Sequence, residues 1–177
     1  IIMPTVSWLA PDGTAAIVCF PGVMYRGGAE KQIRKYLIDN NFIDCIIQLP
    51  DNLFYGTTIA TCIMVLKKSK RDNYTLFLDA SKQCVKITNS NKLTEDNIQT
   101  ILTAYLDRAD KPHFAALVPN DKIAGQDYNL SVSTYVEQED TREVIDIQKL
   151  NAEIAQIVAR EQQLREEIDK IVAEIEG

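Results

Sequence analysis

Two adjacent aromatic residues, Phe54 and Tyr55, stand in a short polar connection between two apolar runs, 45–49 and 59–66. Each run is nearly continuous rather than alternating, which is typical of a strand buried on both faces of a sheet. Proline, aspartate, asparagine and glycine fill the connection and predict a loop, where functional residues are over-represented. Two large rings at the mouth of a covered sheet are therefore the first candidate for a functional site.

The cysteines and the single histidine give little support for a metal site. Cys19, Cys45, Cys62 and Cys84 show no C-x-x-C spacing, and the first three stand within apolar runs. A zinc site needs a cluster of cysteine and histidine that this pattern lacks. We expect reduced, mostly buried thiols in a cytoplasmic protein, and we assign no role to His113.

Basic residues stand out at two places. Arg26 precedes two glycines at the predicted start of a helix, where free amide groups and the helix dipole could hold a phosphate, although ordinary turn chemistry explains the same glycines. The second group, called the basic cluster below, follows the run 59–66 and consists of Lys67, Lys68, Lys70 and Arg71. It is either a solvated strand exit or a phosphate-contact patch near the loop, because Lys and Arg supply most of the affinity for nucleic acid backbones.

The net charge of −6 is distributed unevenly along the 177 residues. Residues 1–136 hold 14 basic and 13 acidic residues, whereas residues 137–177 hold 5 and 12. Any contact with nucleic acid must therefore use a local patch within 1–136, because the acidic tail repels phosphates. No apolar run approaches the roughly 18 residues of a membrane span, and the first residues lack a secretion signal, so no membrane association is expected.

Hydrophobic patterning predicts an α/β fold for most of the chain. A buried strand at 14–20 follows a Pro-Asp-Gly turn, and an amphipathic helix at 29–40 leads to the strand 45–49. A helical crossover of this kind makes the two strands parallel. The aromatic connection is too short for another crossover, so we expect 59–66 to return antiparallel to 45–49.

Shorter patterns predict the remaining elements of the body. Residues 74–78 predict a strand, and 84–87 predict a possible strand that pairs with it. A threonine followed by two acidic residues caps a predicted helix at 94–108. The connection 111–127 contains a possible short strand at 114–118.

A heptad pattern marks 137–177 as a helical tail, distinct from the body at 1–136. With Glu161 in their midst, seven apolar residues form a seam at spacings of three and four: Leu150, Ile154, Ile157, Leu164, Ile168, Ile171 and Ile175. Such a stripe must pack against something, and its isoleucines with charged flanks favour a coiled-coil-like bundle with another chain or another copy. The alternative is a long helix folded back on the body.

Two stretches are especially informative, FPGVMYRGGAE at 20–30 and LPDNLFYGTTIATCIMVLKK at 49–68. Together with NYTLFLDAS, LTEDNIQTI and DYNLSVSTYV, they resemble the modification (M) subunit of type I restriction–modification systems, a DNA adenine-N6 methyltransferase. The resemblance covers most of the chain. It implies a Rossmann-like, S-adenosylmethionine-dependent methyltransferase sheet with an antiparallel last strand, in which 14–20, 42–49 and 59–66 are the final three strands.

The same family uses a glycine-rich loop for the cofactor and an Asn/Asp-Pro-Pro-aromatic motif for the target amine. The sequence contains neither a G-x-G nor a Pro-Pro pair. The chain therefore resembles the C-terminal half of the subunit. We expect that it holds no catalytic residue, and that alone it neither binds S-adenosylmethionine tightly nor methylates DNA.

The resemblance also assigns a role to the aromatic pair. In this class of enzyme an aromatic residue before the antiparallel strand stacks on the flipped-out adenine, and Phe54 is the match by position, with Tyr55 as the alternative. A base removed from the duplex loses stacking worth a few kcal/mol, of which an aromatic face replaces about 1–3 kcal/mol. If Phe54 merely packs under the loop, it has no such role.

The partners implied by the resemblance are duplex DNA and a specificity (S) subunit that binds the C-terminal helices. A nuclease (R) subunit and self-association of the chain stay open. The sequence departs from the family near Thr134, where an arginine is expected. Two other hypotheses compete: a non-catalytic interaction module that uses the C-terminal helix, and a methyltransferase of RNA or protein, against which the FYGTT loop argues.

Overall fold

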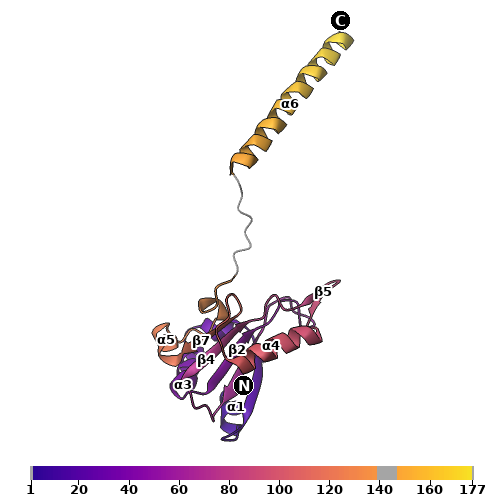
Figure 1. Ribbon diagram of the computed structural model, residues 1–177. Coiled ribbons are helices and arrows are strands. Elements are labelled where there is room, and N and C mark those ends of the chain that lie inside the picture. Colours follow the sequence, from indigo (N-terminus) through magenta and orange to yellow (C-terminus); the bar gives the residue numbers. More distant parts are fainter. Residues whose placement is uncertain (1, 139–146, 177) are drawn as a thin grey trace. The chain divides into compact units, whose positions relative to one another are not determined.

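The computed structural model of the protein describes residues 2–138 and 147–176 (Figure 1). These residues belong to two compact units, one within 1–139 and the other within 140–177. Each unit is described by itself, beginning with the first, which is called the body.

The body is built on a five-stranded sheet with the strand order β1-β3-β2-β4-β7. The strands are β1 (Thr14–Cys19), β2 (Ile43–Gln48), β3 (Cys62–Lys67), β4 (Tyr74–Asp79) and β7 (Ala115–Pro119). Strand β3 is antiparallel to both β1 and β2, and β7 is antiparallel to β4. The pair β2–β4 is parallel. The sheet is thus mixed and mostly antiparallel, in a mixed α/β body.

The predicted antiparallel return is confirmed, but the expectation that 14–20, 42–49 and 59–66 are the final three strands is wrong, because β4 and β7 follow them and join the same sheet. Because β1 and β2 are each antiparallel to β3, they run in the same direction, as the crossover helix between them requires. Every residue of β2 before Gln48 is buried, and β3 is nearly as deeply buried. Burial on both faces explains why these two strands are continuous apolar runs in the sequence.

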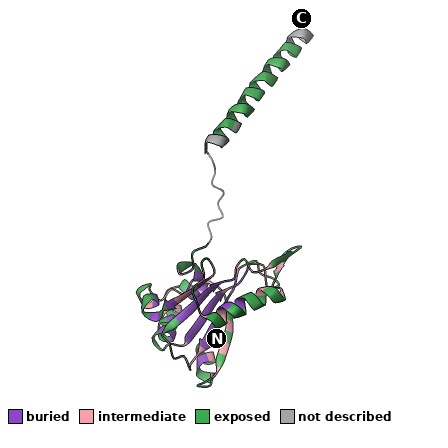
Figure 2. Cartoon of the chain, viewed as in Figure 1, coloured by how far each residue is buried: buried purple, intermediate pink, exposed green. Residues whose placement is uncertain are grey.

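Helices cover both faces of the sheet. They are α1 (Ile2–Trp8), α2 (Gly22–Tyr25), α3 (Ala29–Asp39), α4 (Glu95–Asp107) and α5 (Asn120–Gly125), with a 3₁₀ turn, η1 (Val132–Thr134). Buried residues of α1, α2, α3, α5 and η1 pack on one face around Phe77. Ile101 and Ala104 of α4 pack on the other face against Leu76 and Leu78. Figure 2 shows the resulting buried layer along the strands.

The two longer helices of the body confirm their predictions, and the shorter ones were not predicted. At the start of α4, Thr94 Oγ1 accepts a hydrogen bond from the amide of Asn97 at 3.3 Å, and Asn97 Oδ1 accepts one from the amide of Thr94 at 3.0 Å. This reciprocal cap is what the threonine signal predicts. Helices of four to seven residues, such as α1, α2 and α5, are too short to show a helical period.

The expected pairing of 84–87 with 74–78 is wrong. Strand β4 already has β2 on one edge and β7 on the other, so it has no free edge for another strand. Residues Val85–Ile87 (β5) instead pair with Ser90–Lys92 (β6) in a separate two-stranded hairpin. The possible strand at 114–118 is real and takes the edge position, as β7.

The four cysteines are unpaired, as expected. Cys19, Cys45 and Cys62 are buried, and Cys84 is half-buried. Burial raises the pKa of the Cys62 thiol to about 12, which keeps it protonated and unreactive at neutral pH.

The second unit contains one helix, α6 (Ile147–Glu176), of 30 residues. Five of the seam residues have described side chains, and all five are at least half exposed: Ile154, Ile157, Leu164, Ile168 and Ile171. The side chains of Leu150 and Ile175 lie outside the described residues. Among the helices described, none combines the length and the apolar character that a membrane span requires.

A buried charged cluster ties α4 to the beginning of β2. The side chain of Asp44 is 5% exposed, and its two oxygens accept hydrogen bonds from Arg108 Nη1 at 2.8 Å and from Tyr105 Oη at 2.6 Å. Burial, and then the hydrogen bond to Asp44, raises the pKa of the Tyr105 phenol. The carboxylate of Asp44 thus bonds to Tyr105 in the last turn of α4 and to Arg108 directly after it.

We expect Asp44→Ala to lower the free energy of unfolding by about 3 kcal/mol, because the guanidinium of Arg108, 26% exposed, loses its partner at 2.8 Å and keeps only the carboxylate of Asp72 at 3.5 Å. Tyr105→Phe removes one hydrogen bond and should cost about 1 kcal/mol. Urea denaturation of the two variants measures the difference. Equal losses would show that Asp44 does not hold the cluster together.

Candidate functional site

The carboxyl ends of β1, β2 and β4 lie at one end of the sheet. Cys19 and Gln48, the last residues of β1 and β2, are both paired with Cys62, and Asp79 at the end of β4 is paired with Gln48. The segments that leave these strands therefore gather at the same end. In open α/β sheets, ligands bind outside the carboxyl ends of the strands.

The segment that follows β2, here called the 49–61 loop, is closed at its base and free at its tip. The amide of Leu49 donates to the carbonyl of Thr61 at 2.8 Å, and Gln48 Nε2 donates to the same carbonyl at 3.3 Å. At the tip, Phe54 is 43% exposed and the ring of Tyr55 is fully exposed. Both predicted aromatic residues therefore face solvent, and neither ring is buried beneath the loop.

Glycine is required at the tip of the 49–61 loop. Gly56 has φ +80°, a conformation that residues with a Cβ rarely adopt, and no atom lies within 4 Å of the place where a Cβ would be. The reason for glycine is thus the backbone turn and not a close contact. This turn reverses the chain directly after the aromatic pair.

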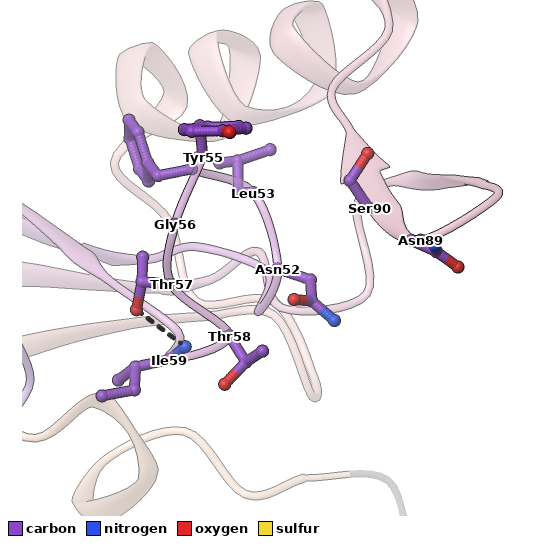
Figure 3. A pocket seen from close by; sticks show the side chains of 10 residues that line it. Asn52, Leu53, Tyr55, Gly56, Thr57, Thr58, Ile59, Asn89 and Ser90 are labelled. Carbon is purple, nitrogen blue, oxygen red and sulfur yellow. Dashed lines mark hydrogen bonds between the residues drawn. The ribbon is translucent and has the colours of Figure 1, made fainter.

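A cleft of about 750 Å³ lies between the 49–61 loop and the turn of the β5–β6 hairpin. Figure 3 shows Tyr55 and Leu53 on the loop and Asn89 and Ser90 on the hairpin, with Asn52 between them. A volume of this size is within the range of small-ligand sites, about 300–1,000 Å³. The cleft can therefore receive a flat ring beside the exposed aromatic pair.

Asn91 joins the hairpin to the loop through three hydrogen bonds. The amide of Asn91 donates to the carbonyl of Asn52 at 2.9 Å. Its side-chain Nδ2 donates to the carbonyl of Asp51 at 2.9 Å and to the carboxylate of Asp51 at 2.8 Å. The two walls of the cleft are thus one hydrogen-bonded unit. No local sequence pattern indicates this link, because the two segments are about 40 residues apart.

Three more exposed apolar side chains lie at the same end of the sheet, and none of them was predicted as a site residue. Phe20 directly follows β1 and is 58% exposed, Tyr25 in α2 is 57% exposed, and Ile59 in the loop is 56% exposed. The available signal was an aromatic residue directly before the Pro21-Gly22 turn. The predicted strand 14–20 includes Phe20, whereas β1 ends at Cys19.

Arg26 also lies at this end, because α2 and its following residue leave the carboxyl end of β1. Its side chain is 65% exposed and its guanidinium is 3.8 Å from the carboxylate of Glu30. The guanidinium packs against Gly22, where a Cβ would come within 2.7 Å of it. Arg26 is therefore held at the start of α3 with its charge accessible.

The basic cluster does not lie near the loop, and that expectation is wrong. Strand β3 carries the chain away from the loop, so that Lys67 is paired with Thr14 at the amino end of β1. The ammonium of Lys70 donates to Asn41 Oδ1 and to the carbonyls of Ile43 and Tyr74, at 2.8, 2.6 and 2.6 Å.

Two members of the basic cluster thus use their charge within the body. Burial lowers the pKa of Lys70 to about 8, and the ammonium of Lys68 donates to the carbonyl of Leu9 at 2.7 Å. Lys67 is half-buried, while Arg71 is exposed. Contact of the cluster with DNA stays a prediction.

His113 and the cysteines form no metal site within 2–138 and 147–176, the residues that the structure describes. His113 Nδ1 lies 3.0 Å from the carbonyl oxygen of Glu137, 24 residues further along the chain.

We expect Asn91→Ala to loosen the 49–61 loop without unfolding the sheet. Two side-chain hydrogen bonds worth about 1 kcal/mol each are lost, so amide exchange in residues 50–60 should become roughly 5- to 30-fold faster. Hydrogen exchange read by mass spectrometry measures this.

Asn89→Ala is the matched control, since Asn89 lines the same cleft. No hydrogen bond joins it to the loop within the part of the chain that the structure describes. If both variants exchange alike, or if β2 and β3 also exchange faster, Asn91 is not the link.

The sequence matches one protein family and several methylase subunits. The profile of the family described as N-6 DNA Methylase matches residues 1–144. The methylase subunit of the type I restriction enzyme MpnII from Mycoplasma pneumoniae is 44% identical over 168 residues, which are 94% of this chain and 31% of that protein. The MjaVII methylase subunit from Methanocaldococcus jannaschii is 36% identical over 91% of this chain and 28% of its own length.

Solved structures agree with these matches. The crystal structure of a type I restriction-modification methyltransferase subunit from Streptococcus thermophilus superposes with a TM-score of 0.75 at 40% identity, over 77% of this chain and 29% of that one. The EcoKI M protein shares the fold alone, with a TM-score of 0.57 at 15% identity over 89% of this chain and 41% of that one. The chain spans about a third or less of the curated relatives described above.

Proposed function

Because the chain belongs to the N-6 DNA methylase family and is related to type I restriction enzyme methylase subunits, we propose that it is the part of such a subunit that holds the target base. The proposed reaction of the whole enzyme is transfer of a methyl group from S-adenosylmethionine to N6 of adenine in duplex DNA. The observation that carries the proposal is the exposed aromatic pair beside a cleft at the carboxyl end of the sheet.

Phe54 is the residue to which we assign stacking on the flipped-out adenine. Its ring is 43% exposed and lines the cleft, so a ligand in the cleft can cover its exposed surface. Base–aromatic stacking is worth about 1–3 kcal/mol, enough to hold a base that has left the duplex. Tyr55 is the second candidate, because its ring has the greater freedom to move.

Cofactor binding and the chemical step belong, in this proposal, to residues outside this chain. The sequence has no G-x-G and no Pro-Pro pair, the two patterns that the family uses for the cofactor and for the target amine. Within the chain, the exposed guanidinium of Arg26 lies at the same end as the loop and can contact a phosphate there. S-adenosylmethionine supplies the methyl group when it is bound to the full-length protein.

Phe54→Ala in the full-length enzyme should lower methyl transfer to adenine by at least about tenfold, because the lost stacking no longer holds the target base. Phe54→Trp, which keeps an aromatic face, should retain most of the activity. Incorporation of labelled methyl into duplex DNA measures both. Unchanged transfer in Phe54→Ala would remove the stacking role from Phe54 and make Tyr55 the next residue to test.

The α6 helix is proposed to bind the specificity subunit through its apolar seam. The exposed side chains of Ile154 and Ile157 lie about one turn apart, and Leu164 lies about two turns further along the same side of the helix. An exposed stripe of this kind favours a second helix that covers it. The relatives are named as subunits of type I restriction enzymes, which fits a chain that assembles with others.

Ile157→Asp should weaken binding to the specificity subunit at least about 100-fold, since an unpaired charge within an apolar interface costs several kcal/mol. Ala159→Asp places the same charge away from the seam of the same helix and should bind normally. Co-elution of the two subunits in size-exclusion chromatography is the measurement. Equal binding by both variants would exclude the seam as the interface.

A further inference from the structure

The β5–β6 hairpin (85–92) has no evident structural purpose in the body. All its residues except Asn91 are exposed, on both faces of the ribbon. Figure 1 shows β5 projecting from the body beyond α4. An isolated two-stranded ribbon is marginally stable in water, so the hydrogen bonds from Asn91 to the 49–61 loop hold it in place.

The charge of the hairpin segment is entirely positive. No acidic residue occurs between Asp79 and Glu95, whereas this stretch contains Lys82, Lys86 and Lys92. Lys86 and Lys92 are exposed, and neither forms an ion pair with any residue of the described ranges 2–138 and 147–176. A solvated lysine that pairs with no acidic residue of these ranges can bind an anion.

The two lysines lie on opposite faces of the ribbon. Lys86 is paired across the hairpin with Asn91, whereas Lys92 is paired with Val85, one position along. Because side chains alternate between the faces of a strand, successive cross-strand pairs point to opposite sides. A ribbon with a lysine on each face can reach a phosphate on either side of it.

The hairpin is also the second wall of the cleft that faces Phe54. A duplex that delivers a base into this cleft must pass its backbone close to the hairpin, since Asn91 fixes hairpin and loop to each other. The major groove of B-DNA, about 12 Å wide, admits a two-stranded ribbon, and lysines bind the phosphates along its edges.

We propose that the β5–β6 hairpin is a DNA-binding element that enters the groove beside the target adenine, with Lys86 and Lys92 on phosphates of its two walls. The inference rests on the proposed function and extends it. It also assigns the backbone contact to the hairpin in place of the basic cluster, which lies at the other end of the sheet with Lys68 and Lys70 bonded internally.

The test uses the full-length methylase assembled with its specificity subunit. The affinity for duplex DNA that contains the recognition site is measured by fluorescence anisotropy over a series of salt concentrations. Lys86→Gln/Lys92→Gln should bind more weakly, and the slope of log K against log salt should become shallower by about 1.8, because each lost phosphate contact removes roughly 0.9.

Lys35→Gln/Lys122→Gln is the matched control, since it removes the same charge from two exposed positions on α3 and α5, outside the hairpin, the cleft and the basic cluster, and should leave the slope unchanged. Lys86→Arg/Lys92→Arg should restore the wild-type slope. An unchanged slope in the hairpin glutamine pair, or equal losses in both glutamine pairs, would overturn the inference.

Methyl transfer by the wild-type complex is measured on the same duplex. If the wild type methylates DNA but the hairpin pair keeps its slope, the inference alone fails. If the wild type transfers no methyl group to any duplex, the proposed function itself fails.

Discussion

The position of β3 between β1 and β2 is the constraint on which the rest of the body depends. Because β3 is antiparallel to both neighbours, its first residue, Cys62, lies level with the carboxyl ends of β1 and β2. The 49–61 loop must therefore begin and end at that end of the sheet, and Phe20, Arg26 and the hairpin follow strands that finish there. A change in the direction of this one strand would separate the aromatic pair from everything that now surrounds it.

The two ends of the sheet are built differently. At the amino end, polar groups are bonded to one another: Asn120 Oδ1 accepts from Thr75 Oγ1 at 2.9 Å, and its Nδ2 donates to Asn41 and Asn73 at 2.9 and 3.0 Å. Lys70 and Asp44 nearby are also bonded within the body, Lys70 to Asn41 and Asp44 to Arg108. At the carboxyl end, rings and lysines face solvent and a cleft lies open.

Sequence patterns were sufficient where burial alone determines the structure. The apolar runs of β2 and β3, the short connection between them and the cap at Thr94 predicted the central strands, their directions and α4. Patterns failed where the outcome depends on which edges are already occupied, as with β5, or on very short helices such as α5. They also misplaced the basic cluster, because adjacency in sequence to a loop was taken for adjacency in space across a strand of six residues. The link through Asn91 depends on a contact between distant segments, which no local pattern records.

Strand β1 forms an edge of the sheet. Among the described residues it pairs with β3 alone, so one row of its N–H and C=O groups has no strand beside it. Val18, 54% exposed, adds apolar surface to this open edge. Such an edge is a template for strand addition, and solubility then depends on what covers it. Since the exposed rings of Phe20 and Tyr25 follow β1 directly, a strand that joins this edge would also reach the end of the sheet where these rings lie.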